Sequence, residues 1–204
     1  MSAPQYSIGF DLGSSSVKAA LIRLEDGAAV GRSSYPEQEM PIQAPQPGWA
    51  EQDPEFWWQC IKAVTRQLLE QTGAPGTAIG SIGIAYQMHG LVLVDEQQRV
   101  VRPSIIWCDS RAVATGQAGF EAIGQDRALK HLLNSPGNFT ASKLKWVQQE
   151  EPGTYGRIHK IMLPGDYIAM RMSGHIQTTI TGLSEGIFWD FADRRVSSDV
   201  LRVY

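Results

Sequence analysis

Cysteines are scarce in this sequence, and its basic residues form no cluster. The 204 residues include two cysteines, Cys60 and Cys108, which lie far apart and outside any Cys-x-x-Cys pattern. So sparse a set predicts neither a disulfide framework nor a zinc site, and it fits a reducing compartment. The formal net charge is −3, which argues against a nucleic-acid partner, because nucleic-acid surfaces neutralise phosphates with grouped Lys and Arg.

Long apolar runs are also missing. No stretch approaches the roughly 20 residues that a membrane-spanning helix needs, and the N-terminus lacks the basic and apolar regions of a signal peptide. We therefore expect a cytoplasmic protein with no membrane partner. Hydrophobic residues make up 43% of the sequence, enough for one core and for one domain plus part of another. Residues 200–204 are still apolar and patterned, so we expect the natural sequence to continue.

The first motif predicts a β-hairpin with polar groups at its tip. Apolar runs flank the turn Gly13-Ser14-Ser15-Ser16, and glycine supplies the backbone freedom that such a turn needs. Asp11 is expected to end the first strand, where its carboxylate could hold Mg²⁺ through bound waters. The serine hydroxyls and consecutive N–H groups could face an anion. An ordinary solvated turn is the alternative, because short Gly/Ser motifs recur by chance.

The next segments predict an α/β arrangement. A third strand over 28–35 and a proline-rich loop over 36–48 lead to a helix that starts at Pro54 and ends before Gly73. Trp49 and Glu51, just before this helix, are interpreted as structural rather than functional. Residues 80–86 alternate isoleucine with small residues, which suits a central strand covered closely by helices.

A second candidate site follows that strand. Strands joined by helical crossovers usually present ligand-binding groups at their carboxyl ends, and Gln87-Met88-His89-Gly90 lies at such an end. His89 could hydrogen-bond a sugar hydroxyl, and Met88 could pack against the carbon skeleton. A purely structural turn is the alternative. Asp109, after the next hairpin (91–107), could equally cap a helix with its carboxylate.

The remaining sequence predicts a lobe of helices. Helical patterns cover 112–123 and 126–133, and a further helix is expected from Thr140 to just before Pro152. A short helix is expected over 166–172, and two brief strands within 178–188. Lys143 and Lys145 are interpreted as solvated. The histidines show no metal-ligand spacing.

Taken together, six segments resemble the FGGY family of carbohydrate kinases, and within it the xylulokinases most. The matching segments are 11–18, 49–54, 87–90, 106–111, 136–144 and 163–167. Each is weak alone, whereas six in the same order are strong. The resemblance implies an α/β fold of the actin-like ATPase, ribonuclease-H-like type, with a mixed sheet flanked by helices. It also implies that residues 1–204 are an N-terminal sugar-binding domain, with the nucleotide-binding domain outside this chain.

The resemblance also implies roles for individual residues. Asp11 matches the family's catalytic aspartate, which orders Mg²⁺ through water. Substrate-binding roles fall on Met88, His89, Trp107, Asp109 and Arg111, and phosphate-binding roles on Gly13, Ser14, Ser15, Ser16 and Lys18. Glycerol kinases carry Arg-Glu where this chain has Met88-His89, which speaks against glycerol. Cys108, where xylulokinases often have Asn, and the divergent segment 179–186 leave the sugar open.

The activity implied is ATP- and Mg²⁺-dependent phosphorylation of a ketose, first of all D-xylulose to D-xylulose 5-phosphate. Kinases for ribulose, fuculose or gluconate are alternatives, as is a noncatalytic sugar-sensing or scaffold protein of the same fold. The expected partners are a small-molecule sugar and a nucleotide, with a homodimer left open. Residues 1–204 alone are expected to be inactive, because the family's general base lies beyond them.

Overall fold

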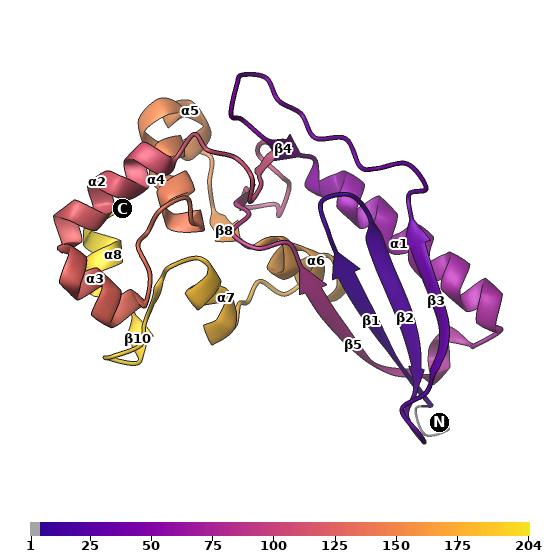
Figure 1. Cartoon of the computed structure of the whole chain (residues 1–204). Helices are drawn as coiled ribbons and strands as arrows, with labels where there is room; N and C mark the ends of the chain where they lie inside the picture. The colour runs from indigo at the N-terminus through magenta and orange to yellow at the C-terminus, as the bar shows by residue number, and fades with distance from the viewer. Residues whose placement is uncertain (1–4) are drawn as a thin grey trace. The chain divides into compact units, whose positions relative to one another are not determined.

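The computed structural model describes residues 5–204, which divide into two compact units. Unit 1 contains the residues up to Pro41 together with Glu55–Gln87, and unit 2 contains Ile42–Pro54 and Met88–Tyr204. Figure 1 traces the chain through the elements of both units. None of the helices in this described part combines the length and the apolar character that crossing a bilayer requires.

Unit 1 is a four-stranded mixed sheet with one long helix. The strands are β1 (Tyr6–Leu12), β2 (Val17–Arg23), β3 (Ala29–Tyr35) and β5 (Ile79–Tyr86), in the order β3-β2-β1-β5. β1, β2 and β3 are antiparallel neighbours, whereas β5 runs parallel to β1. A parallel pair needs a crossover connection, which α1 (Pro54–Thr72) and the 3-10 turn η1 (Gly76–Ala78) supply. The predicted hairpin, third strand and helix are confirmed.

Strand alternation makes one sheet face apolar. Alternate residues of β1 and β2 are buried, namely Ile8, Phe10, Leu12, Val17, Ala19 and Leu21. In α1 the residues at helical spacing, Trp57, Ile61, Val64 and Leu68, are at most 2% exposed. Ser33 of β3 donates to the Gln67 side chain of α1 at 3.0 Å, and Figure 1 shows α1 beside the sheet. Each large apolar side chain buried in this way contributes about 1.5–3 kcal/mol.

β5 departs from the prediction of a central strand. Among the described residues it pairs with β1 alone and so forms an edge of the sheet. Ile82 is 52% exposed, although its neighbour Ile8 in β1 is 1% exposed. The alternation of large and small residues reports the two faces of a strand, but it does not reveal whether both edges are paired. The central placement is therefore wrong for this chain.

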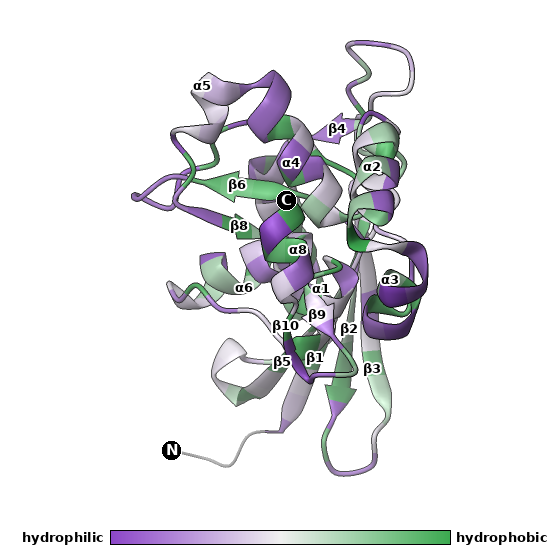
Figure 2. Cartoon of the chain, turned by 90° about the vertical axis from the view of Figure 1, so that its left-hand side faces the viewer, coloured by the Kyte–Doolittle hydropathy of each residue, from purple (hydrophilic) through white to green (hydrophobic). Residues whose placement is uncertain are grey.

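Unit 2 contains short helices and three small strand pairs. Its helices are α2 (Val113–Ile123), α3 (Gln125–Leu132), α4 (Thr140–Glu150), α5 (Pro152–Tyr155), α6 (Pro164–Ser173), α7 (Ile180–Glu185) and α8 (Ser198–Val203). The strand pairs are β4 (Glu51–Gln52) with β7 (Ser104–Ile105), β6 (Val92–Val94) with β8 (Lys160–Met162), and β9 (Trp189–Asp190) with β10 (Arg195–Val196). All of β6 is buried, and it is green in Figure 2.

One expectation for unit 2 is wrong, and a second is confirmed with an additional strand pairing. Residues 178–188 were predicted to hold two strands, but most of them form α7, whose N-cap Thr179 accepts a hydrogen bond from the Gly182 N–H. The β-branched residues there favour strands, and capping overrides that weak propensity. The predicted 91–107 hairpin is present in irregular form, with antiparallel bridges between Leu91 and Ile105 and between Val94 and Val100. In addition β6 pairs with β8, about 70 residues further along the chain, which the sequence did not indicate.

Helix α4 lies between two hydrophobic clusters of unit 2. One cluster includes Ala141, with Phe139 packed against it, and the other includes Val147, with Trp146 packed against it. Leu91, directly after the 87–90 turn, belongs to the second cluster. The turn that carries the second candidate site is thereby anchored to the core that holds α4.

Candidate functional site

In unit 1 the predicted catalytic aspartate, Asp11, has an exposed side chain on strand β1. Asp11 is directly opposite Lys18 in the β1–β2 register, with 3.8 Å between Oδ2 and Nζ. The two side chains are 56% and 65% exposed. An exposed ion pair of this kind contributes little to stability. Both charged groups are therefore accessible to a ligand.

The tip of the hairpin is held by backbone hydrogen bonds. The Gly13 N–H donates to the Ser16 carbonyl at 3.1 Å, and the Ser15 carbonyl accepts from the Met40 N–H at 2.8 Å. A Cβ on Gly13 would lie 3.2 Å from the Ser16 carbonyl oxygen, closer than side chains normally approach. The tight turn thus explains the glycine that begins the predicted phosphate-binding segment.

A hollow of ≈ 500 Å³ lies on unit 1 beside Asp11. Its lining includes Gly9, Asp11, Lys18, Ala20, Arg32 and Ser34. Exposed carboxylate oxygens suit hydrated Mg²⁺, and the two cations suit an anion. These residues fit a metal–phosphate group, and the hollow adds Arg32, which the sequence did not indicate. Ser14, Ser15 and Ser16 do not line the hollow, so their phosphate contacts stay a prediction.

In unit 2 the predicted sugar-contacting turn has an unusual backbone. Met88 is 53% exposed, and His89 has a φ of 56°, in the left-handed region that non-glycine residues rarely adopt. A Cβ on Gly90 would lie 2.6 Å from Cγ of Pro164, so only glycine fits there. Left-handed residues cost about 1–3 kcal/mol and cluster at functional sites, where surrounding contacts maintain them.

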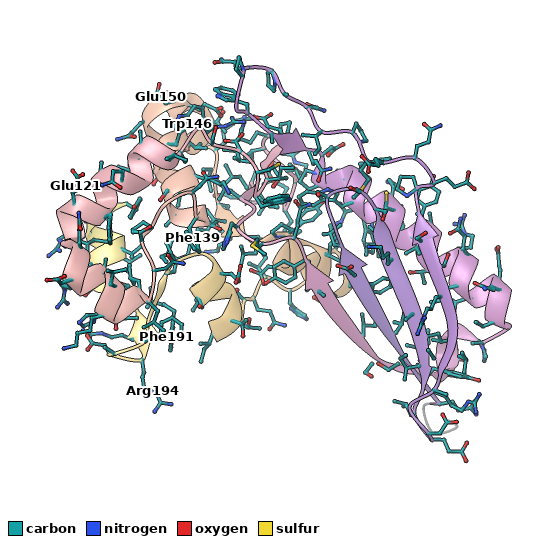
Figure 3. The ribbon with its side chains drawn as sticks, in the orientation of Figure 1. Glu121, Phe139, Trp146, Glu150, Phe191 and Arg194 are labelled. Atoms are coloured by element: carbon teal, nitrogen blue, oxygen red, sulfur yellow. The ribbon has the colours of Figure 1, made fainter. Side chains whose placement is uncertain are left out.

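Three neighbours fix the His89 side chain and backbone. Its Nδ1 lies 3.0 Å from the carbonyl oxygen of Glu185 and 3.4 Å from Oε2 of the same residue. Its ring centroid lies 4.1 Å from that of Phe139, with a tilt of 57°. Figure 3 shows Phe139 at the start of α4. The backbone carbonyl of His89 accepts from Lys143 Nζ at 2.7 Å.

The prediction that Lys143 is solvated is wrong. The residue is 0% exposed. Burial lowers the pKa of its ammonium to about 8, and the nearby carboxylate of Asp109 opposes that shift. The sequence carried a signal that was missed: Lys143 lies three residues after Thr140 and four before Val147, both buried on one helical face. Lys145 on the same helix is half-buried.

Trp107 and Asp109 differ sharply in accessibility. Trp107 is 48% exposed, whereas Asp109 is 0% exposed. The Asp109 carboxylate accepts from the Ala50 N–H at 2.6 Å and from the Arg111 N–H at 2.8 Å. The side-chain amide of Asn138 donates to the Asp109 carbonyl. The carboxylate therefore bonds backbone N–H groups, but it does not cap a helix, because α2 begins only at Val113 and its N-cap is Ala112. The helix-cap alternative is wrong.

Arg111 lies at the centre of a buried ionic network. Its Nη2 lies 2.7 Å from Asp109 Oδ2 and its Nη1 lies 2.7 Å from Glu51 Oε1, with its side chain 1% exposed. The guanidinium stacks on Trp49 at 3.7 Å and lies 5.0 Å from the Trp146 ring. The structural interpretation of Trp49 and Glu51 thus has a concrete basis. Direct contact of Asp109 or Arg111 with a substrate stays a prediction, because their charged groups face one another.

Among the described residues, one group of side chains is spaced closely enough to hold a metal ion. The ligand atoms of His131, Asp190 and Asp193 all lie within 4.8 Å of one another. However, His131 Nδ1 bonds Asp190 Oδ2 at 2.9 Å, and Asp190 also accepts the Asp193 N–H at 2.8 Å. These groups satisfy one another, so the cluster is a structural link between α3 and the β9–β10 hairpin.

Comparison with known proteins finds sugar kinases both among similar sequences and among similar structures. The chain is 38% identical to the xylulose kinase of Escherichia coli K12 over 194 residues, which cover 95% of this chain and 38% of that protein. The solved structure of a xyloylose kinase from Brucella ovis matches with a TM-score of 0.87 and 33% identity, over 97% of this chain and 40% of that one. The gluconate kinase of Lactobacillus acidophilus matches with a TM-score of 0.86 over 97% of this chain and 39% of that one, but its 21% identity shows the fold alone.

These matches confirm the predicted α/β fold of the actin-like, ribonuclease-H-like type. The chain spans about 38% of the length of the curated relative with 38% identity. A family model described as the N-terminal domain of the FGGY family of carbohydrate kinases matches residues 6–204. Since that match covers nearly the whole chain, this protein belongs to the FGGY family of carbohydrate kinases.

Proposed function

We propose that the protein carrying this chain is an ATP-dependent pentulose kinase that converts D-xylulose to D-xylulose 5-phosphate. The observation that carries the proposal is the 38% identity to a xylulose kinase across 95% of the chain. In the proposed reaction a sugar hydroxyl oxygen attacks the γ-phosphorus of ATP, and the bond from that phosphorus to the ADP oxygen breaks. The hydroxyl proton passes to a general base.

The turn in unit 2 is the proposed sugar-contacting element. His89 would hydrogen-bond a hydroxyl, while exposed Met88 and Trp107 would pack against the carbon skeleton. Asp109 and Arg111 are bonded to each other, so we assign them first to shaping the segment that carries Trp107. A buried ion-pair network of this kind holds its segment rigid, which lowers the cost of ordering it around a ligand.

The hairpin in unit 1 is the proposed phosphate and metal element. Asp11 would hold Mg²⁺ through water, and Lys18 with the Gly13–Ser16 tip would face the phosphates. Bound Mg²⁺ supplies charge neutralisation at the transferring phosphoryl group. We further propose that residues 1–204 are an N-terminal sugar-binding domain and that the base and adenine site lie in sequence beyond them. A cytoplasmic location belongs to the same proposal, because ATP is the phosphoryl donor.

Other sugars are the main competing substrates, because the fold is shared with a gluconate kinase and fold does not determine function. The test is a coupled ADP-release assay of the natural-length protein with D-xylulose, ribulose, fuculose and gluconate. We expect the largest kcat/KM for D-xylulose. A larger value for another sugar would reassign the substrate. Sugar binding without ADP release from any of the four would favour a noncatalytic sugar sensor.

A further inference from the structure

The backbone carbonyl of His89 is hydrogen-bonded by a buried lysine side chain. Lys143 is 0% exposed, and its Nζ donates to the His89 carbonyl at 2.7 Å. Burying an ammonium group is costly unless it is hydrogen-bonded. The acceptor belongs to a residue with a φ of 56°, whose conformation needs support from its surroundings. One hydrogen bond therefore joins the buried ammonium group of Lys143 to the left-handed residue His89.

The imidazole of His89 is held in a defined protonation pattern by Glu185. The carbonyl oxygen of Glu185 lies 3.0 Å from Nδ1, and a carbonyl oxygen can only accept. Nδ1 must therefore carry a hydrogen. In a neutral imidazole the other nitrogen, Nε2, is then an acceptor, because only one ring nitrogen bears a proton. The Oε2 atom of Glu185, 3.4 Å from Nδ1, favours the same arrangement.

We propose that Lys143 and Glu185 are positioning residues for the sugar site: Lys143 holds the His89 backbone in its left-handed turn, and Glu185 fixes the tautomer that leaves Nε2 as the acceptor for a substrate hydroxyl. This inference rests on the proposed function for the identity of the ligand. The ring centroid of Phe139 lies 4.1 Å from that of the imidazole, so Phe139 restricts the orientation of the imidazole from one side. A purely structural lysine would affect stability alone, whereas a positioning lysine also affects the imidazole and the sugar affinity.

The first measurement concerns the tautomer and needs no ligand. In the natural-length protein labelled with ¹⁵N-histidine, two-bond ¹H–¹⁵N spectra distinguish a protonated Nδ1 from a protonated Nε2. The His89 signals are assigned by their loss in His89→Gln. We expect the Nδ1–H form at a pH where the ring is neutral. An Nε2–H form would overturn the inference, whether or not the protein binds a sugar.

The second measurement compares Lys143→Met with Lys145→Met, a change on the same helix at a half-buried residue. Isothermal titration with D-xylulose is expected to show about tenfold weaker binding for Lys143→Met, with unchanged ATP affinity and an unchanged Lys145→Met control. Equal D-xylulose affinity in Lys143→Met and wild type would overturn the role of Lys143. If the wild type binds no D-xylulose, the proposed substrate fails, and the inference is then judged by the His89 spectra. In that case shifted His89 signals in Lys143→Met support it and unshifted signals overturn it.

Discussion

The guanidinium of Arg111 stacks on the ring of Trp49, with 3.7 Å from Cζ to the ring centroid. The same guanidinium lies 5.0 Å from the Trp146 ring and bonds the carboxylates of Asp109 and Glu51. Segments of unit 2 that are far apart in sequence are therefore joined at one cation. Such a network is stable only while every charge in it has a partner.

Arg111→Met is expected to lower the free energy of unfolding by about 3–5 kcal/mol, because it leaves the buried carboxylate of Asp109 without its hydrogen-bonded cation, whereas Glu51 keeps its pair with Arg102. Urea unfolding followed by circular dichroism measures the change. Arg195→Met is the matched control, since Arg195 forms an exposed pair with Asp193 and should change stability by at most about 0.5 kcal/mol. Equal unfolding midpoints for Arg111→Met and wild type would show that the network contributes nothing.

Local patterns predicted the elements of unit 1 well, whereas long-range contacts were beyond them. The hairpin at Asp11 and the helix from Pro54 follow from period-two and period-3.6 spacing with clear turn residues. The pairing of β6 with β8 and the edge position of β5 depend on partners distant in sequence, which no local pattern encodes.

The candidate site shows the same division. Met88 and Trp107 were predicted as contact residues and are exposed, as such a role requires. Lys143 was misplaced because a charged residue is assumed to be solvated unless a partner is known. Its partner is a backbone carbonyl 54 residues away, in a residue with a left-handed conformation that the sequence did not indicate.

Asp11→Asn in the natural-length protein is expected to lower kcat at least about a hundredfold while leaving D-xylulose affinity nearly unchanged. The carboxylate would act mainly on the phosphoryl group in the transition state, so its loss appears in kcat rather than in sugar binding. Because the side chain is 56% exposed, folding should be unaffected. Steady-state kinetics and titration with D-xylulose measure the two quantities. A wild-type kcat in the variant would reduce the hairpin to an ordinary turn.

His89→Ala is expected to weaken D-xylulose binding by about 1–3 kcal/mol, the usual cost of leaving a partly buried polar partner unmet. ATP affinity should barely change. The control is His159→Ala, because His159 is an exposed histidine of the same unit. Isothermal titration measures both affinities, and equal dissociation constants for His89→Ala and wild type would remove His89 from the sugar site.

The buried ammonium of Lys143 should make stability depend on pH in a predictable direction. Its pKa is about 8 in the folded protein, against 10.5 for the exposed group. Between these values the unfolded chain binds more protons than the folded one, so the free energy of unfolding rises with pH. At about 1.4 kcal/mol per pH unit, the rise across this window is on the order of 3 kcal/mol.

Other groups, including Tyr204 and both cysteines, titrate at alkaline pH, so the informative quantity is the difference between wild type and Lys143→Met. Urea unfolding at pH about 7 and about 10 should show stability rising more in wild type than in the variant. The variant has no amine at this position, so it does not bear the energetic cost of burying an ammonium group at the lower pH. Lys145→Met, which changes a half-buried neighbour, should follow the wild-type curve. If the free energy of unfolding changes with pH equally in wild type and Lys143→Met, the Lys143 ammonium stays solvated in the folded protein. That result would conflict with its 0% exposure.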